Sequence, residues 1–162
     1  MPTPEPGAIA VRPATPDDAG TLVELLRAGA LSTSDEDAGD LTPYRAALAD
    51  IAATPGTDVL VAERDGEVIG TCELLTFRHL QHRGGRCAEV ESMHVRPDLR
   101  GTGVGGVLLE AAVEAARAAG CYRVQLTSNA ARTDAHRFYE HHGFTSSHVG
   151  FKRLLDPSSG GA

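Results

Sequence analysis

The residues best suited to chemistry in this chain are the glycines of the stretch 100–106, which reads R-G-T-G-V-G-G. Glycine lets a backbone turn sharply and approach a ligand closely. A helix-like run begins directly behind the stretch, and the first amides of a helix have no partner within it. Such amides bind anions, so the stretch predicts a seat for phosphate oxygens.

Two common phosphate-binding motifs fit this stretch poorly. The loop of nucleotide-hydrolysing enzymes supplies a lysine to the outer phosphates, and the only lysine of this chain is the distant Lys152. The dinucleotide fingerprint G-x-G-x-x-G matches as Gly101, Gly103 and Gly106. In that class a strand leads straight into the glycines and a later carboxylate binds the ribose. Here residues 96–100 intervene and the next strand ends without a carboxylate, which disfavours a dinucleotide-binding oxidoreductase.

A third phosphate motif, [Q/R]-x-x-G-x-[G/A], fits without exception. Arg100, Gly103 and Gly105 occupy its defined positions. Because the motif also precedes a helix-like run, it is the version of the phosphate seat that the residues favour.

Length and composition predict one domain. At 162 residues the chain is long enough to bury a proper core, and we expect a single domain over residues 8–155 with flexible tails at 1–7 and 156–162. The net charge of −7 argues against nucleic acid or an anionic membrane as partner. No membrane-length apolar run or secretory signal occurs, and three widely spaced cysteines suggest reduced thiols. A cytoplasmic protein is therefore expected.

The elements that position the glycine stretch alternate between strands and helices. Asp65-Gly66 is a hairpin signal, and Thr15-Pro16 is a helix start. The periodicities predict strands at 8–12, 58–62, 67–77, 87–95, 122–127 and 149–155, and helices beginning at 15 and 42 and spanning 104–119 and 133–142. The helix at 104–119 should bury Val104, Val107, Leu108, Ala111 and Ala115. Residues 78–85 should form a loop. This order gives an α/β fold, a mixed sheet with helices on its faces.

Four segments together resemble the Gcn5-related N-acetyltransferase (GNAT) superfamily. The hairpin at 61–70 resembles the second and third strands of that family, and E-S-M-H-V-R-P at 91–97 resembles its fourth strand and exit. Residues 100–105 resemble its acyl-CoA pyrophosphate loop. Asn129 with A-H-R-F-Y-E-H-H-G-F at 135–144 resembles its late CoA-contacting segment. The segments occur in the order and at the spacing of the family.

The resemblance implies a GNAT fold and acetyl transfer. The fold has a central, mixed, mostly antiparallel sheet of six to seven strands, about four helices, and fourth and fifth strands that splay apart. The implied reaction moves acetyl directly from acetyl-CoA, without a metal, to a primary amine of a small molecule or a protein N-terminus. It is also compatible with a homodimer. A non-catalytic acyl-CoA-binding or regulatory module on the same fold is the alternative.

The resemblance assigns cofactor contacts chiefly to the backbone. Amides around the phosphate loop would hold the pyrophosphate of acetyl-CoA, the exit of the fourth strand would pair with its pantetheine arm, and one side chain from the late segment would contact the same arm. Asn129 fits equally well as a turn residue. The implied cofactor-binding residues are Met93, His94, Val95, Arg100, Gly101, Thr102, Gly103, Val104, Gly105, Gly106 and Asn129.

The resemblance assigns catalysis to Tyr139 and Glu91. Tyr139 would protonate the departing thiolate, and Glu91 would help to deprotonate the amine, directly or through water. Glu89 shares a strand face with Glu91 and is a candidate for the acceptor cleft, as is His148 on the late loop. His94 should point to the opposite face of the strand. The histidines and cysteines show no metal-ligand spacing.

Overall fold

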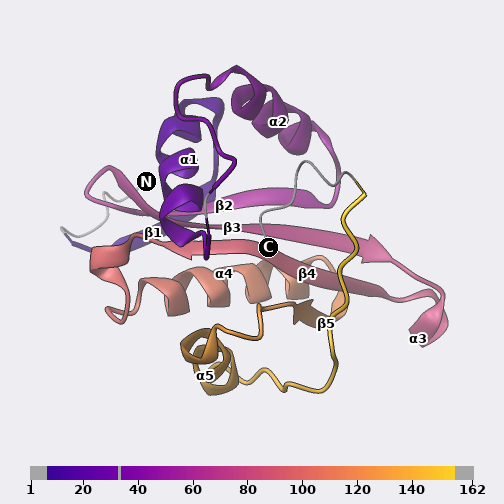
Figure 1. The fold of residues 1–162 in the computed structure, drawn as a ribbon. Helices are drawn as coiled ribbons and strands as arrows, with labels where there is room; N and C mark the ends of the chain where they lie inside the picture. The colour runs from indigo at the N-terminus through magenta and orange to yellow at the C-terminus, as the bar shows by residue number, and fades with distance from the viewer. Residues whose placement is uncertain (1–6, 33, 156–162) are drawn as a thin grey trace.

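The computed structural model describes residues 7–32 and 34–155 as a sheet covered by helices on both faces (Figure 1). The predicted tails, apart from Gly7, lie outside the described residues. The sheet has the order β1-β2-β3-β4-β5, with three antiparallel pairs followed by a parallel β4–β5 pair. Its strands are β1 (Ile9–Pro13), β2 (Thr57–Arg64), β3 (Glu67–Arg78), β4 (Arg86–Val95) and β5 (Cys121–Leu126). The predicted mixed, mostly antiparallel sheet is therefore confirmed.

The strand count is lower than predicted. The sheet of the described residues has five strands rather than six to seven, because the segment 149–155 is extended but joins no strand. No backbone–backbone hydrogen bond links this segment to another described residue. A segment forms a strand only when its backbone pairs with a neighbouring strand. The sequence of this segment suits a strand, but its backbone has no such partner among the described residues.

Among the described residues, four helices of two turns or more flank the sheet, as predicted. In Figure 1, α1 and α2 lie on one side of the sheet, and α4 and α5 lie on the other. The predicted loop at 78–85 contains one short turn, α3, in which His82 and Arg83 have left-handed φ angles. The helices are α1 (Ala19–Gly29), α2 (Thr42–Ala53), α3 (Gln81–Gly84), α4 (Val104–Ala118) and α5 (Thr133–His141), with 3₁₀ turns η1 (Pro16–Asp18) and η2 (Pro97–Leu99).

The start of the first helical segment follows the local sequence. Thr15 and Asp18 form a capping box, in which the Thr15 amide donates to Asp18 Oδ2 at 2.7 Å. Arg12 of β1 pairs with the same carboxylate at 2.8 Å. The hydrogen bond from Arg12 lowers the pKa of Asp18 to about 2. These contacts tie η1 to β1 and set the direction in which α1 crosses the sheet.

Helix α4 supplies much of the main core, but its buried face is rotated from the prediction. Val104 and Leu108 are buried as expected, whereas Val107 is 42% exposed. The sequence of α4 is apolar around most of its circumference, so periodicity does not single out one stripe. Packing against the sheet decides which residues of α4 are buried. The buried residues of α4 are Val104, Leu108, Leu109, Ala112 and Ala116.

The described helices contain no segment long and apolar enough to cross a bilayer. All three cysteines are free, and two of them, Cys72 and Cys87, are buried in the sheet.

Candidate active site

The candidate site begins where β4 and β5 part. Their parallel ladder runs as far as the pair Val90 and Leu126. Beyond it, residues 91–95 of β4 remain paired with β3 alone. The edge of β4 that would face β5 therefore has no strand partner over these residues. The predicted splaying of the fourth and fifth strands is confirmed.

A β-bulge in β4 changes which side chains share a face. Thr71 pairs with His94 and Glu73 pairs with Glu91, so Cys72 alone lies opposite two residues of β4. Ser92, within the bulge, has a φ of +48°. The extra residue resets the alternation of the strand. His94 consequently lies on the same face as Glu91, and the prediction that it points to the opposite face is wrong.

Three carboxylates collect on that face of the sheet. Glu73 lies directly opposite Glu91, and Glu89 is two residues earlier on the same strand. Gln125 of β5 donates to Glu89 Oε2 at 3.2 Å. Burial, followed by the neighbouring charge of Glu89, raises the pKa of Glu91. Burial likewise raises the pKa of Glu73, although a hydrogen bond with Ser92 opposes it.

Glu73 was not among the predicted site residues. Its signal in the sequence is indirect, because it depends on the register of the β3–β4 pair. That register is set by the connection between β3 and β4, for which the sequence predicts only a loop at 78–85. Glu73, Thr71 and Ser92 also line a small cavity of about 100 Å³ beneath the apolar sides of α1 and α2. The acidic face therefore adjoins a partly open, largely apolar space.

Tyr139 lies on the other side of β4. Its hydroxyl is 3.9 Å from Sδ of Met93, and its ring makes edge contacts with Phe138 and Phe144 at centroid distances of 5.2 and 6.0 Å. Burial raises the pKa of Tyr139, while the charge of Arg132 opposes the rise. The phenol is therefore protonated at neutral pH and held among apolar groups next to the bulge.

The phosphate loop has the local geometry of an anion seat. Gly103 is the N-cap of α4 with a left-handed φ of +92°, a conformation that favours glycine. The amide of Val107 makes the first helical bond, to the Gly103 carbonyl at 3.1 Å. The amides of residues 103–106 consequently have no partner within the helix. A side chain placed at Gly101 or Gly103 would meet no described atom within 4 Å.

The last two glycines of the loop have a packing role. A Cβ at Gly105 would lie 3.3 Å from the Phe138 ring, and a Cβ at Gly106 would lie 3.0 Å from the His142 ring. Both rings belong to the segment of α5, so these glycines let α5 approach α4 closely. The sequence pattern assigned them to phosphate binding alone. The structure adds a second reason for their small size.

Two arginines converge on the C-terminal end of α1. Arg100 of the phosphate loop donates to the carbonyls of Ala28 and Val95 at 3.4 and 3.3 Å. Arg132, from the loop between β5 and α5, donates to the carbonyl of Gly29. Carbonyls at a helix C-terminus lack helical partners and attract cations. Arg132 was not predicted, since it meets α1 only through the tertiary fold.

His94 fills the space between these groups. A Cβ on Gly29 would lie only 1.9 Å from Nδ1 of His94, so the ring rests directly on the α1 backbone. Burial lowers the pKa of His94, and the charges of Arg132 and Arg100 lower it further. The imidazole is therefore neutral near neutral pH. Sequence reasoning considered only the backbone of this residue for function.

The remaining two predicted residues lie at the margin. Asn129 Oδ1 accepts from the Ala131 amide at 2.9 Å, which closes a turn ahead of α5. His148 is exposed and its Nδ1 lies 2.8 Å from the Ser147 hydroxyl. The roles assigned to both residues stay predictions.

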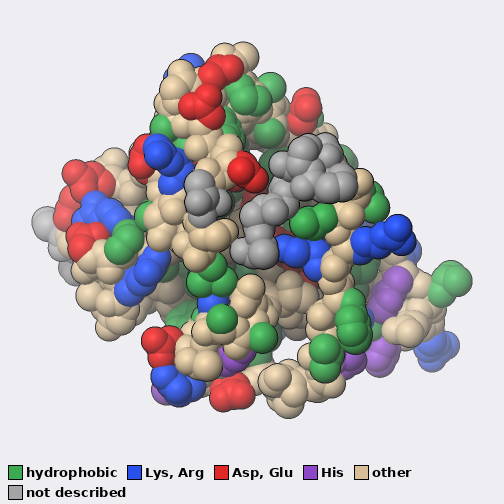
Figure 2. Space-filling view, in the orientation of Figure 1, with side chains coloured by type: hydrophobic (Ala, Val, Ile, Leu, Met, Phe, Trp, Pro, Cys, Tyr) green, Lys and Arg blue, Asp and Glu red, His purple; other side chains and the backbone are tan. Residues whose placement is uncertain are grey.

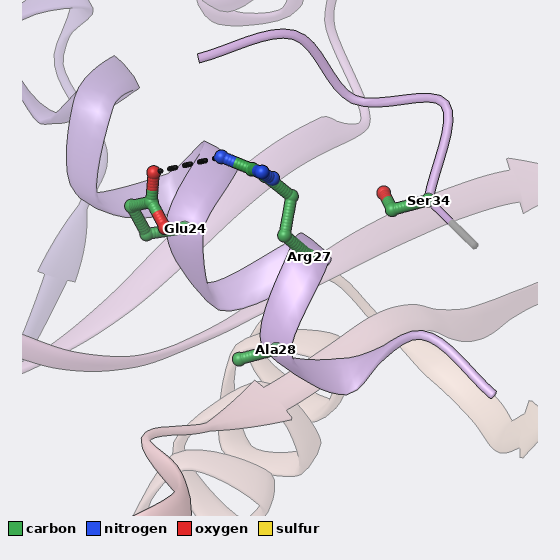
Figure 3. A pocket seen from close by; sticks show the side chains of 4 residues that line it. All are labelled: Glu24, Arg27, Ala28 and Ser34. Carbon is green, nitrogen blue, oxygen red and sulfur yellow. Dashed lines mark hydrogen bonds and ion pairs between the residues drawn. The ribbon is translucent and has the colours of Figure 1, made fainter. Parts of the chain in front are cut away.

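A larger, open cavity of about 420 Å³ lies beside the C-terminal half of α1. Figure 3 shows Glu24, Arg27 and Ala28 on the helix, with Ser34 across from them on the following loop. Arg27 pairs with Glu24 at 3.3 Å. Because Arg100 also donates a hydrogen bond to the Ala28 carbonyl, this hollow adjoins the first residue of the phosphate loop.

Among the residues that the structure describes, no group of histidine, cysteine or carboxylate side chains is placed to hold a metal.

Known proteins resemble this chain in sequence and in fold. The model of the acetyltransferase (GNAT) family matches residues 24–144. An aminoalkylphosphonate N-acetyltransferase of Salmonella typhimurium is 36% identical over 116 residues, covering 72% of this chain and 75% of that protein. An aminoglycoside N(6′)-acetyltransferase type 1 of Stenotrophomonas maltophilia is 33% identical and covers 92% of this chain and 95% of that protein.

A solved structure agrees with these relatives in fold. The crystal structure of a transcriptional regulator from Bacillus halodurans superposes with a TM-score of 0.85 at 29% identity, covering 91% of this chain and all of that one. The family match and the relatives thus define an acyltransferase. The chain belongs to the acetyltransferase (GNAT) family, and it is an N-acetyltransferase. This sets aside the non-catalytic module and the dinucleotide-binding oxidoreductase.

Proposed function

We propose that this enzyme transfers acetyl from acetyl-CoA to the primary amine of a small, cationic molecule. The observation that carries the proposal is the cluster of Glu73, Glu89 and Glu91 on one face of the sheet, beside the point where β4 leaves β5. An aliphatic amine is an ammonium ion at neutral pH, and three carboxylates favour its binding. The domain that performs this reaction spans residues 8–155.

Acetyl-CoA would lie along the open edge of β4. We propose that the amides of Gly101 and of residues 103–106 hold its pyrophosphate, with support from the dipole of α4. Backbone groups of residues 93–95 would pair with the pantetheine amides, in the manner of an added strand. Asn129 would contact the same arm through its side-chain amide group, since its Oδ1 already closes a turn.

The two faces of β4 would divide the proton transfers between them. Glu91 accepts a proton from the ammonium, and its raised pKa makes it a stronger base than an ordinary glutamate. The free amine then attacks the thioester carbon, and amides of the bulge around Ser92 stabilise the resulting oxyanion. When the carbon–sulfur bond breaks, Tyr139 donates its proton to the departing thiolate, and the nitrogen loses its second proton to water to give the neutral amide. Each residue regains its starting state by exchange with water.

The acceptor proposal rests on charge and on the relatives. Their names specify an aminoalkylphosphonate and an aminoglycoside, both small molecules with amines. The acidic loop after α1 adds further negative charge, with Glu36 held by the Tyr44 hydroxyl at 2.8 Å. A protein N-terminus is the alternative acceptor. The free thiols of Cys72 and Cys87 support a reducing, cytoplasmic setting.

The first experiment is calorimetric titration with acetyl-CoA, using NAD as the negative control. We expect micromolar binding of acetyl-CoA alone. A panel of amines and N-terminal peptides would then be assayed by release of the CoA thiol. Absence of acetyl-CoA binding, with no other acyl-CoA bound instead, would overturn the proposal.

Substitution of the proposed acid links the activity to this site. Tyr139→Phe should lower kcat by about 10²-fold or more while leaving acetyl-CoA affinity within about twofold. Tyr122→Phe is the matched control, since Tyr122 is 37% exposed at the far end of β5 and stacks on His79. Equal activity of the two variants would remove Tyr139 from the mechanism.

A further inference from the structure

The end of the β3–β4 hairpin carries a basic surface that lies outside the candidate active site. It is formed by residues 77–88 together with residues 120–126 at the start of β5, and these stretches contain no aspartate or glutamate. In Figure 2, basic and histidine side chains gather at the end of the molecule where Figure 1 places α3, next to an exposed hydrophobic side chain. We call this the hairpin surface, and its basic members are Arg78, Arg83, Arg86, Arg123, His79 and His82.

The arginines of the hairpin surface are not neutralised within the chain as the structure describes it. None of the four makes an ion pair with a described residue. Arg78 lies directly opposite Arg86 in the β3–β4 ladder, and like charges in such a cross-strand pair destabilise a sheet. The next carboxylate along β4, that of Glu89, accepts a hydrogen bond from Gln125 instead. Carboxylates supplied from outside would therefore relieve this repulsion.

Aromatic contacts hold the basic groups of the hairpin surface in place. The ring of His79 stacks on Tyr122 with a centroid distance of 5.5 Å and an interplanar angle of 8°. The ring of His82 lies 3.9 Å from the same ring, and Cζ of Arg123 lies 5.4 Å from its centroid. Tyr122 thus joins the start of β5 to the turn α3. Because the surface is already formed, less conformational freedom is lost when a partner binds.

An apolar side chain stands among these charges. Leu80, which precedes α3, is 95% exposed, and Phe77 at the end of β3 is 40% exposed. The Phe77 ring makes an edge contact with His79 at a centroid distance of 6.3 Å. Protein interfaces combine apolar anchors with a polar rim. The hairpin surface therefore suits a ligand that offers both carboxylates and an apolar side chain.

We propose that the hairpin surface binds a short acidic segment of a partner protein. Carboxylates of the segment lie against the four arginines, and one of its apolar side chains lies against Leu80 and Phe77. The net charge of −7 repels an extended polyanion such as nucleic acid or an anionic membrane. A short segment is governed by the charges within a Debye length, about 10 Å at 0.1 M ionic strength. The phosphate loop follows the opposite end of β4, so both sites can be occupied together.

Fluorescence anisotropy tests the proposal with a short labelled peptide of aspartate and glutamate around one central leucine. The full chain should bind this peptide saturably, and added salt should weaken binding. The same peptide with lysine at every acidic position should not bind. Combining Arg83→Glu with Arg123→Glu should raise the dissociation constant at least about tenfold, and Leu80→Ser should raise it at least about threefold.

Arg45→Glu is the matched control for charge reversal. Arg45 is exposed on α2, on the opposite side of the chain from the hairpin surface in sequence and fold, and this variant should bind the peptide as the wild type does. Urea unfolding checks that each variant is folded. If the glutamate pair unfolds the chain, Arg83→Gln with Arg123→Gln takes its place and should still weaken binding.

Three results would overturn the proposal. The first is a wild type that does not bind the acidic peptide. The second is an equal loss of binding in Arg45→Glu, since binding would then follow net charge and not the hairpin surface. The third is tighter binding of single-stranded DNA or of phosphatidylserine vesicles that the paired arginine variant abolishes, which would assign the surface to nucleic acid or to a membrane. None of these measurements depends on the transfer reaction.

Discussion

The two faces of the β3–β4 pair are built from alternating residues of the same strands, yet they serve different ends. The face towards α4 presents Cys72, Leu74 and Val90, which are at most 2% exposed and belong to one apolar cluster. The face towards α1 presents Glu73 and Glu91, whose pKa values are raised by burial. One face is stabilised by packing, and the other keeps charged groups partly out of water.

The difference shows how a single strand can support both stability and chemistry. The apolar face excludes water and fixes the backbone, so the carboxylates opposite are held close despite their repulsion. The bulge at Ser92 lies at the boundary, where Met93 faces α4 at 3.6 Å from the Cβ position of Gly105 and His94 faces α1. Changes on the apolar face should therefore alter stability, and changes on the acidic face should alter turnover.

The largest effect should come from the apolar face. Leu108→Ala removes a fully buried side chain of α4 and should lower the free energy of unfolding by about 2–5 kcal/mol. Val107→Ala is the neighbouring control, and because Val107 is 42% exposed it should cost less than about 1 kcal/mol. Urea unfolding of both variants measures the difference. Similar losses of unfolding free energy in the two variants would mean that Val107 is buried, as the sequence predicts, and not exposed.

On the acidic face, Glu91→Gln should reduce kcat/KM by about 10²-fold, because an amide cannot accept the proton of the ammonium. Unfolding free energy should change little. Glu140→Gln, on the exposed side of α5, controls for the loss of one negative charge. Steady-state kinetics with the best amine of the panel provide the measurement, and full activity in Glu91→Gln would transfer the role of base to Glu73, Glu89 or water.

A smaller effect concerns the pH profile. Glu91 must be ionised to act as base, so kcat/KM should fall as pH drops through its raised pKa. Glu89→Gln removes a neighbouring negative charge that raises that pKa. The acidic limb of the profile should consequently move to lower pH in this variant. A limb that stays in place would show that Glu91 does not control it.

The smallest effect lies away from both faces, at the start of the first helical segment. Asp18→Asn weakens the capping box and the ion pair with Arg12, and should cost about 1 kcal/mol at neutral pH. The lowered pKa of Asp18 means that its contribution is present above the unfolded value near 3.8 and is lost as pH falls towards 2. The wild type and the variant should therefore converge in stability at low pH. A constant gap down to pH 2 would contradict this assignment.

Much of the fold could be read from short stretches of sequence. Thr15-Pro16 predicted the helical start that its capping box confirms, and Asp65-Gly66 predicted the β2–β3 hairpin. The glycine stretch predicted the loop before α4, whose start at Val104 was placed correctly. Each of these features depends on residues within a turn or two of one another, so local rules of conformation suffice.

Other features depended on contacts between distant parts of the chain. The bulge shifts the register of β4 by one residue, and this alone moves His94 onto the face of Glu91. The connection between β3 and β4 sets the register that places Glu73 opposite Glu91. Arg132 reaches Gly29 across 103 positions of sequence. The predicted last strand found no neighbour among the described residues. The sequence by itself determined the helices, the hairpin, the phosphate loop and the family, because those signals are local or ordered along the chain. Only the tertiary structure decided which charged groups meet, because register, helix rotation and loop approach are fixed by packing over the whole sheet.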